Sequence, residues 1–232
     1  MKDNKIDYKQ SQRSSTPVRS LPQQSYAGMV WTSQLPTRNL SDLQLRIKIK
    51  QEANQGNYKN AVRLLNQLLA LQPDSAIDYN NRGLMYLKMG NYEQAMVDFN
   101  QAIAINPRLD RAYNNRGNCY AIQGNLRKAV ENYEQALDIN PYNQRAWLNK
   151  GVTLRELAEY GLAIETLEIA KIMGEQYHGR IYAERGYTQY LRGDWNCAIA
   201  DYRRALSCLS ERDHYYQKVV TWLGQVLKPI IS

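Results

Sequence analysis

The chain has 232 residues, of which 44% are apolar, and a formal net charge of +8. This length and apolar content are enough to bury a sizeable core in one elongated domain, which excludes a wholly disordered chain. No stretch of about 18 consecutive apolar residues occurs, so the sequence predicts no membrane-spanning helix.

The first segment, residues 1–41, is rich in Ser, Gln, Pro and Arg and has no helical spacing of apolar residues. It carries six Lys or Arg and two Asp, so it holds +4 of the total charge. We therefore expect a flexible basic tail. Its apolar island at residues 26–31 is either a loosely packed patch or a docking motif, for a partner or for the chain's own groove.

The N-terminus and the cysteines bear on the compartment. No apolar run follows Met1, so no signal peptide is expected. Cys119, Cys197 and Cys208 are odd in number and lie in helical stretches, which favours free thiols in a reducing compartment. We expect a cytoplasmic protein, with peripheral attachment to the cytoplasmic side of a membrane left open.

From residue 42 onward a helix-turn-helix pattern returns at a spacing of 34 residues until its last step, where His178 is an extra residue. The sequence predicts five helical hairpins, over residues 42–75, 76–109, 110–143, 144–177 and 179–210. Glycine accepts the left-handed conformation that often follows a helix end, so glycines mark the turns inside four hairpins. These are Gly56, Gly90, Gly124 and Gly193. In the fourth hairpin Ala158 stands instead.

The turns between hairpins contain prolines, which cannot continue a helix. These are Pro73, Pro107 and Pro141. Inside each hairpin the same sizes of residue recur. The first helices carry Leu45, Tyr79, Tyr113, Trp147 and Tyr182 at one large position. A glycine follows at Gly83, Gly117, Gly151 and Gly186, with Ile49 in the first hairpin. The second helices carry Ala61, Ala95, Ala129, Ala163 and Ala198, and four residues later Leu65, Phe99, Tyr133, Leu167 and Tyr202.

This pattern resembles the tetratricopeptide repeat (TPR) from residue 42 to about residue 210. The resemblance implies an all-α, right-handed α-solenoid of five hairpins, in which small residues permit close helix crossings and large ones fill the space between neighbours. The amino-acid composition of the repeats, which is rich in Asn and Gln, is similar to that of bacterial TPR proteins, especially cyanobacterial ones. Some of those proteins help to assemble membrane complexes.

Residues 211–232 predict a last helix. Its apolar stripe consists of Val219, Trp222, Leu223, Val226 and Leu227. A solenoid needs a terminal cap, so we expect a capping helix. The alternatives are a helix that forms a dimer contact and an amphipathic helix that lies in the membrane interface.

The first helices of such hairpins are expected to line a concave groove, with Asn81, Asn115 and Asn149 at the sixth position of three hairpins. A primary amide has both donors and an acceptor, so these three side chains are candidates to hold the main chain of an extended peptide. Similar asparagine ladders grip peptides in the O-GlcNAc transferase family. Alternatively, the amides satisfy local backbone groups or face water.

Other groove positions are polar or basic. We expect them to complete a peptide-binding site, with further amides from Asn80, Asn114 and Asn118 and cations from Arg46, Lys50, Arg111 and Arg145. Lys88, Arg155 and Arg180 are also groove cations. Because Arg binds carboxylate bidentately, this composition fits an acidic segment or a free C-terminus. A solvated face is the alternative explanation.

Some TPR adaptors clamp the acidic C-terminus of chaperones. The corresponding positions here would be Arg46, Lys50, Asn81, Arg111 and Asn115. Of these, Lys50 and Asn115 depart from the pattern, which counts against a chaperone clamp.

The seventh position of the first helices is basic in all five hairpins: Lys48, Arg82, Arg116, Lys150 and Arg185. These side chains are either a cationic ladder for phosphate or packed stems whose heads reach carboxylates such as Asp98 or Glu131. We favour the structural interpretation.

No phosphate-binding loop, nucleophile elbow or metal-ligand spacing occurs around His178 or His214, so we expect neither catalysis nor a cofactor or metal. The predicted function is a non-enzymatic adaptor or assembly factor that binds an extended, acidic segment of a partner protein. The alternatives are a nucleic-acid-binding solenoid that uses tail and groove cations, and a peripheral scaffold for assembling membrane complexes.

Overall fold

The computed structural model describes residues 40–231, in which all regular structure is α-helical. The helices are α1 (Leu40–Asn54), α2 (Tyr58–Leu71), α3 (Ala76–Lys88), α4 (Tyr92–Ile105), α5 (Asp110–Ile122), α6 (Leu126–Ile139), α7 (Gln144–Glu156), α8 (Tyr160–Ile172), α9 (His178–Arg192), α10 (Trp195–Cys208) and α11 (His214–Ile231). The expected tail and its island at residues 26–31 lie outside the described residues.

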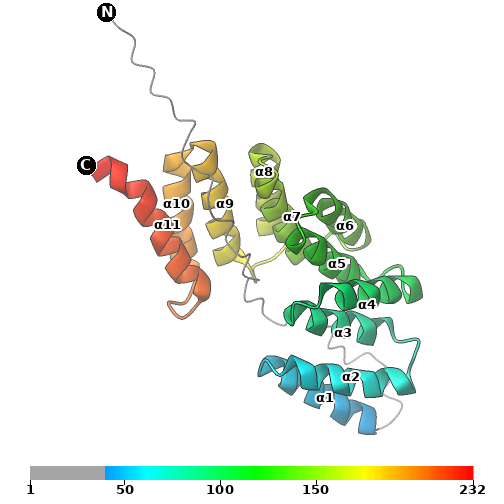
Figure 1. Cartoon of the computed structure of the whole chain (residues 1–232). Helices are drawn as coiled ribbons and strands as arrows, with labels where there is room; N and C mark the ends of the chain where they lie inside the picture. The colour runs from blue at the N-terminus through cyan, green and yellow to red at the C-terminus, as the bar shows by residue number, and fades with distance from the viewer. Residues whose placement is uncertain (1–39, 232) are drawn as a thin grey trace, which may run out of the picture.

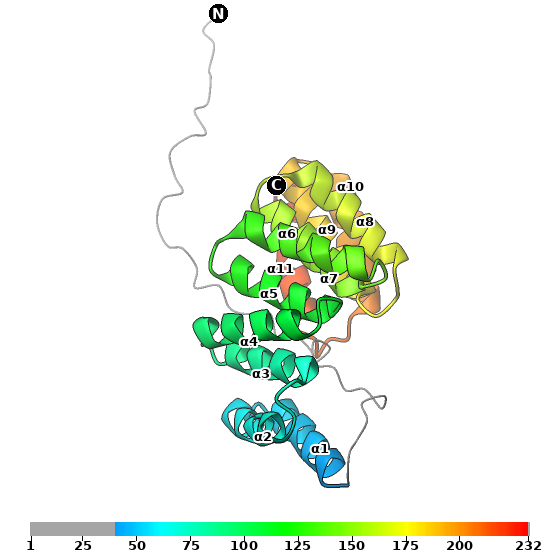
Figure 2. The same cartoon turned by 90° about the vertical axis from the view of Figure 1, so that its right-hand side faces the viewer.

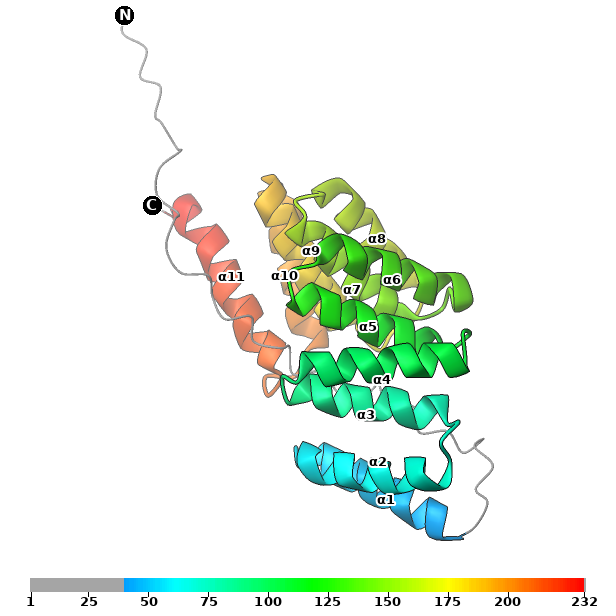
Figure 3. The same cartoon turned by 45° about the vertical axis from the view of Figure 1, so that its right-hand side comes forward.

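Consecutive helices pack as five hairpins, from α1–α2 to α9–α10, and each hairpin packs on the next (Figures 1 and 2). The first helices α3, α5, α7 and α9 also contact one another in turn, so they form a continuous inner layer. The helices lie across the view in the first two hairpins and run steeply in the last (Figures 1 and 3). The predicted all-α solenoid is confirmed.

The helix starts depart slightly from expectation at both ends of the array. Helix α1 begins at Leu40, two residues before the expected start, and α9 begins at His178. The links before α3, α5 and α7 are residues 72–75, 106–109 and 140–143, whereas the link before α9 is residues 173–177. Helix α9 nevertheless begins 34 residues after α7, and it has 15 residues where α3, α5 and α7 have 13, so α9 itself accommodates the extra residue of the sequence.

The second to fifth hairpins each close on a contact between a glycine and a large side chain. A Cβ added at Gly117 would lie 2.7 Å from the Tyr133 ring, and one at Gly186 would lie 2.9 Å from the Tyr202 ring. Tyr133 and Tyr202 are themselves 1% and 0% exposed. The glycines therefore permit close packing against these rings, as the sequence pattern predicts.

The turns inside the hairpins use left-handed backbone. The four turn glycines have φ between 78° and 98°, and Ala158 adopts φ 63° at the same place in the fourth hairpin. The local hydrogen bonds match those of a glycine turn: Ala158 N donates to Arg155 O over 2.9 Å, and Gly124 N to Ala121 O over 3.1 Å. The fourth hairpin therefore keeps the turn geometry without the residue that favours it.

We expect Ala158→Gly to stabilise the protein by about 1 kcal/mol, because a left-handed residue with a Cβ carries a cost of about 1–2 kcal/mol, partly offset by the entropy of glycine. Urea unfolding of both proteins measures the difference. The matched change Gly124→Ala should destabilise by a similar amount; a gain in stability from Gly124→Ala would contradict this account.

Helix α11 closes the end of the solenoid against α9 and α10. Val219 and Val226 are buried, and the Trp222 ring stacks on Tyr187 of α9 with ring centroids 4.5 Å apart. The capping role predicted for this helix is confirmed. Among the described helices, none is both long and apolar enough to cross a membrane. Cys119, Cys197 and Cys208 are free thiols.

Candidate functional site

The asparagines of the inner layer hydrogen-bond to one another across three hairpins. Asn149 of α7 donates to Asn114 of α5 over 3.1 Å, and Asn115 of α5 donates to Asn80 of α3 over 2.9 Å. Within each helix, Asn114 donates to Asn115 and Asn80 to Asn81, both over 3.4 Å. The five amides thus form one continuous chain of hydrogen bonds from the fourth hairpin to the second.

This amide chain gives the asparagines a structural role that the sequence did not predict. All five side chains are between 0 and 6% exposed. A typical hydrogen bond contributes about 1 kcal/mol, and an amide left unpaired in a buried place costs more than that. A grip on a peptide main chain stays a prediction for these residues, and any substitution of them also affects how the hairpins pack.

Asn118 on α5 differs from the other amides. Its Oδ1 accepts a hydrogen bond from the Tyr133 hydroxyl over 2.9 Å. Its amide nitrogen is buried and has no hydrogen-bond partner in the part of the chain that the structure describes. Such a donor is costly to leave unpaired. A ligand carbonyl is one group that would satisfy it.

The two cations predicted in the first hairpin have different surroundings. Arg46 binds Asp78 of α3 through both terminal guanidinium nitrogens, at 2.5 and 2.9 Å. Lys50 is exposed. Arg46 therefore joins α1 to α3, and a ligand carboxylate would have to compete with a buried aspartate for it. The cations of the later hairpins are the stronger candidates.

The basic residues at the seventh position bind within their own or the neighbouring hairpin. Their partners are Asp98 for Arg82, Asn132 for Arg116, Glu134 for Lys150 and Asp201 for Arg185. The structural interpretation is confirmed for Arg82, Lys150 and Arg185, whose heads reach carboxylates, whereas Arg116 reaches amide oxygens instead. Asp98 is a partner as predicted, whereas α6 supplies Glu134 and not Glu131.

A different situation holds at the second position of the last three hairpins, which carries Arg111, Arg145 and Arg180. Arg145 and Arg180 line one pocket of about 660 Å³, and Arg111 and Arg145 line a neighbouring one of about 340 Å³. Arg145 donates to the Tyr177 hydroxyl over 2.8 Å. Arg180 lies over the Tyr215 ring, 5.1 Å from its centroid. The neighbours of these two guanidiniums are thus tyrosines.

Lys88 belongs to the same region. Burial, together with the positive charges of Arg145 and Arg180, lowers the pKa of its ammonium to about 8. Burial also lowers the pKa of Arg145, with Arg180 and Arg111 acting in the same direction and Tyr177 opposing them. These groups are therefore within electrostatic reach of one another.

Glu184 occupies the sixth position of the fifth hairpin, where the asparagine ladder ends. It accepts hydrogen bonds from Arg155 and, over 2.7 Å, from the Tyr215 hydroxyl of α11. Burial raises its pKa, but Arg155, Arg180 and these hydrogen bonds outweigh burial and lower the pKa to about 2. Glu184 is thus an ionised, buried carboxylate that neutralises Arg155 and holds the cap.

Sequence reasoning missed Tyr177 and Tyr215, which lie outside the repeating positions and meet the arginines only in the folded chain. Arg180 was recognisable, because it continues the spacing of Arg111 and Arg145 across the one extra residue.

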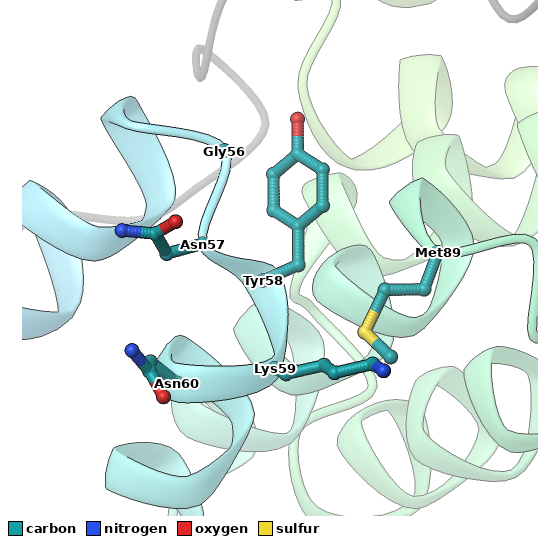
Figure 4. A pocket seen from close by; sticks show the side chains of 6 residues that line it. All are labelled: Gly56, Asn57, Tyr58, Lys59, Asn60 and Met89. Atoms are coloured by element: carbon teal, nitrogen blue, oxygen red, sulfur yellow. The ribbon is translucent and has the colours of Figure 1, made fainter.

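A separate hollow of about 350 Å³ lies at the turn between α1 and α2. Figure 4 shows Tyr58 and Met89 facing it from α2 and the end of α3, with Lys59 beside Met89. It contains one charged side chain and no cluster of polar groups aimed at a common point. It is therefore a weaker candidate than the arginine-lined pockets.

Solved structures with similar folds come from several TPR proteins. TTC0263, a thermophilic TPR protein of Thermus thermophilus, is 20% identical over 79% of this chain and 96% of its own, with a TM-score of 0.66. YrrB, described as a TPR protein with an unusual peptide-binding site, is 15% identical over 75% of this chain and 89% of its own, with a TM-score of 0.56. The APC/C hetero-tetramer Cut9–Hcn1 matches at 21% identity over 83% of this chain and 37% of the other, with a TM-score of 0.69.

No curated protein matches the sequence. Family models described as tetratricopeptide repeat match residues 50–75, 76–109, 110–143 and 132–165, which together run without a gap from residue 50 to residue 165. The fifth hairpin lies beyond these matches but keeps the same contact of a glycine, Gly186, with a large ring, Tyr202. The chain belongs to the tetratricopeptide repeat family.

Proposed function

We propose that the chain is a non-enzymatic, cytoplasmic adaptor or assembly factor that binds an extended acidic segment, or an acidic C-terminus, of a partner protein along its inner layer. The observation that carries this proposal is the contrast between two sets of cations. Those at the seventh position of the last four hairpins are bound to carboxylate or amide oxygens of the protein itself, whereas Arg145 and Arg180 line a pocket beside tyrosines. Positive charge on the inner layer is thus available to a ligand.

The amides of the inner layer support the same proposal. The Asn80, Asn81, Asn114, Asn115 and Asn149 chain fixes the spacing of the three central hairpins, and Asn118 has an amide nitrogen without a partner among the described residues. A rigid, amide-rich layer loses little freedom when a main chain binds to it. In this proposal the arginines bind ligand carboxylates and the amides bind the ligand backbone.

The general role agrees with the family, because TPR domains are protein-binding scaffolds. One structural neighbour carries a peptide-binding site in its description, and another is a subunit of a hetero-tetramer. At their low identity these neighbours speak for the fold alone. The acidic nature of the segment is argued from the charges of this chain.

The test is a selection from a random dodecapeptide phage library on the immobilised full-length protein. We expect enrichment of peptides rich in Asp and Glu, and an affinity loss of about tenfold or more in Arg111→Gln/Arg145→Gln, because each charge-assisted hydrogen bond contributes about 1.5–3 kcal/mol. The matched control, Arg63→Gln/Arg203→Gln, removes the same charge from exposed positions on α2 and α10.

If no peptide is enriched, the proposal is overturned. Enrichment of peptides without acidic residues would also overturn it. Mixed-sequence single-stranded RNA and anionic vesicles serve as further probes in the same assay format. Binding of either of them that survives a saturating acidic peptide would place the ligand outside this site and would contradict the proposed mode.

A further inference from the structure

Three positive side chains lie within electrostatic reach of one another across the inner layer. Arg145 and Arg180 stand in the first turns of α7 and α9 and line one pocket. Lys88 is the last residue of α3, and that end of α3 lies on the side of the α8–α9 link in Figure 1. The charges act on one another, since both arginines lower the pKa of Lys88.

The carboxylates nearby do not balance these charges. Glu184 is bound to Arg155, a fourth cation, and to the Tyr215 hydroxyl, and its charge also acts on Arg180, so one carboxylate is shared between two guanidiniums. Glu175 and Asp213 line the pocket from exposed positions, and Asp213 accepts a hydrogen bond from the backbone N–H of Tyr215 over 2.8 Å. Two exposed carboxylates and the shared Glu184 therefore face four cations, and one of the two exposed carboxylates caps α11.

The two guanidinium groups also have N–H donors that could bind a ligand. Arg180 Nε is buried and has no hydrogen-bond partner within residues 40–231. Arg145 donates to a phenol oxygen, that of Tyr177, and not to a carboxylate. A protein gains nothing in stability from holding like charges together in a partly buried place. Like charges that are held together at a cost in stability often mark a binding site.

We propose that Lys88, Arg145 and Arg180 form the anchor site for a doubly negative group on the bound protein segment, either a phosphate monoester or two adjacent carboxylates. This inference rests on the proposed function and names the place where the acidic segment is held most tightly. A lone carboxylate matches one guanidinium, whereas a phosphate offers three acceptor oxygens and nearly two charges to two guanidiniums and an ammonium.

The first experiment compares three synthetic peptides of one sequence that differ only at the centre: phosphoserine, Asp-Asp and Asn-Asn. Fluorescence anisotropy with the full chain should show that the first two bind about tenfold or more tightly than the third. Arg180→Gln should remove most of this preference, and Arg203→Gln on the outer helix α10 should leave it unchanged. The ranking of the two anionic peptides identifies the group.

A second experiment separates a ligand role from a structural one. Lys88→Met removes a half-buried charge that is repelled by two arginines, so it should raise the melting temperature while it weakens the binding of the anionic peptides. The wild-type affinity should also fall as the pH rises from about 7 to about 9.5, because Lys88 loses its charge there while both arginines and the phosphate keep theirs. Lys88→Met should abolish that pH dependence.

The outcomes distinguish this inference from the proposed function. If acidic peptides bind but Lys88→Met and Arg180→Gln bind them as well as Arg203→Gln does, the anchor site is wrong while groove binding stands. If no acidic peptide binds but pyrophosphate shifts the Arg145 and Arg180 side-chain N–H signals in NMR spectra, the anion site stands and the peptide function is wrong. If neither is seen, both are overturned.

Discussion

Replacing Glu184 with Ala should lower the free energy of unfolding by about 3–5 kcal/mol, the cost of breaking a buried ion pair from one side. Glu184 is 2% exposed and is bound by Arg155 and by the Tyr215 hydroxyl of the cap. Its loss leaves the Arg155 guanidinium without its hydrogen-bonded carboxylate and removes the hydrogen bond from Tyr215 that joins α11 to the fifth hairpin. Urea unfolding followed by circular dichroism measures the change.

The pair itself is expected to be dispensable. Arg155→Met/Glu184→Met should recover most of the lost stability, because an apolar pair of similar volume often replaces a buried ion pair at little cost. An equal or larger loss in the double variant would contradict the assignment.

The Glu184 contribution has a defined pH dependence. Its pKa is lowered from 4.5 to about 2 in the folded protein. The folded state therefore holds fewer protons than the unfolded state between these values, and stability falls as the pH drops through this range. The difference between wild type and Glu184→Ala should shrink between about pH 4.5 and about pH 2, and a constant difference would contradict the ionised pair.

Replacing Phe99 with Ala should cost about 3–5 kcal/mol, the usual loss for an aromatic residue removed from a packed core. Phe99 is 0% exposed and closes the second hairpin against Gly83, where an added Cβ would lie 2.8 Å from the ring. Gly83→Ile should also destabilise, by about 1–3 kcal/mol or more, because the ring cannot retreat without opening the hairpin.

The first hairpin provides the matched control for this contact. There Ile49 and Leu65 stand where the second hairpin has Gly83 and Phe99, and both are 1% exposed. The double variant Gly83→Ile/Phe99→Leu should therefore lose less stability than the sum of the losses in Gly83→Ile and in Phe99→Leu. If the losses measured by urea unfolding are additive, this contradicts the idea that a smaller side chain at position 99 makes room for a larger one at position 83.

The fold was predictable because its determinants recur in the sequence. Ala61, Ala95, Ala129, Ala163 and Ala198 occupy one close crossing, and all five are 0% exposed in the structure. A spacing that returns five times identifies which residues must meet without any knowledge of distant contacts. The same holds for the basic seventh position, where the structural interpretation was correct for Arg82 and Arg185.

The site was predictable in outline and not in its pairings. The asparagines were placed on the inner layer, but the bond from Asn149 to Asn114 joins the sixth position of one hairpin to the fifth of another, which depends on how far the hairpins slide past each other. Arg46 and Lys50 look alike in the sequence, yet only Arg46 meets a buried partner, Asp78. Such pairings depend on packing between hairpins, which spacing alone does not fix.

The most direct test of the central claim compares two triple variants of equal net charge for binding to an acidic peptide selected on the wild type. Lys88→Met/Arg145→Gln/Arg180→Gln removes the three cations of the proposed anchor site, and Lys59→Met/Arg63→Gln/Arg203→Gln removes three exposed cations from α2 and α10. We expect the first to weaken binding by about a hundredfold or more and the second to change it little. Equal losses in both variants would mean that net charge alone attracts the peptide and would contradict a site on the inner layer.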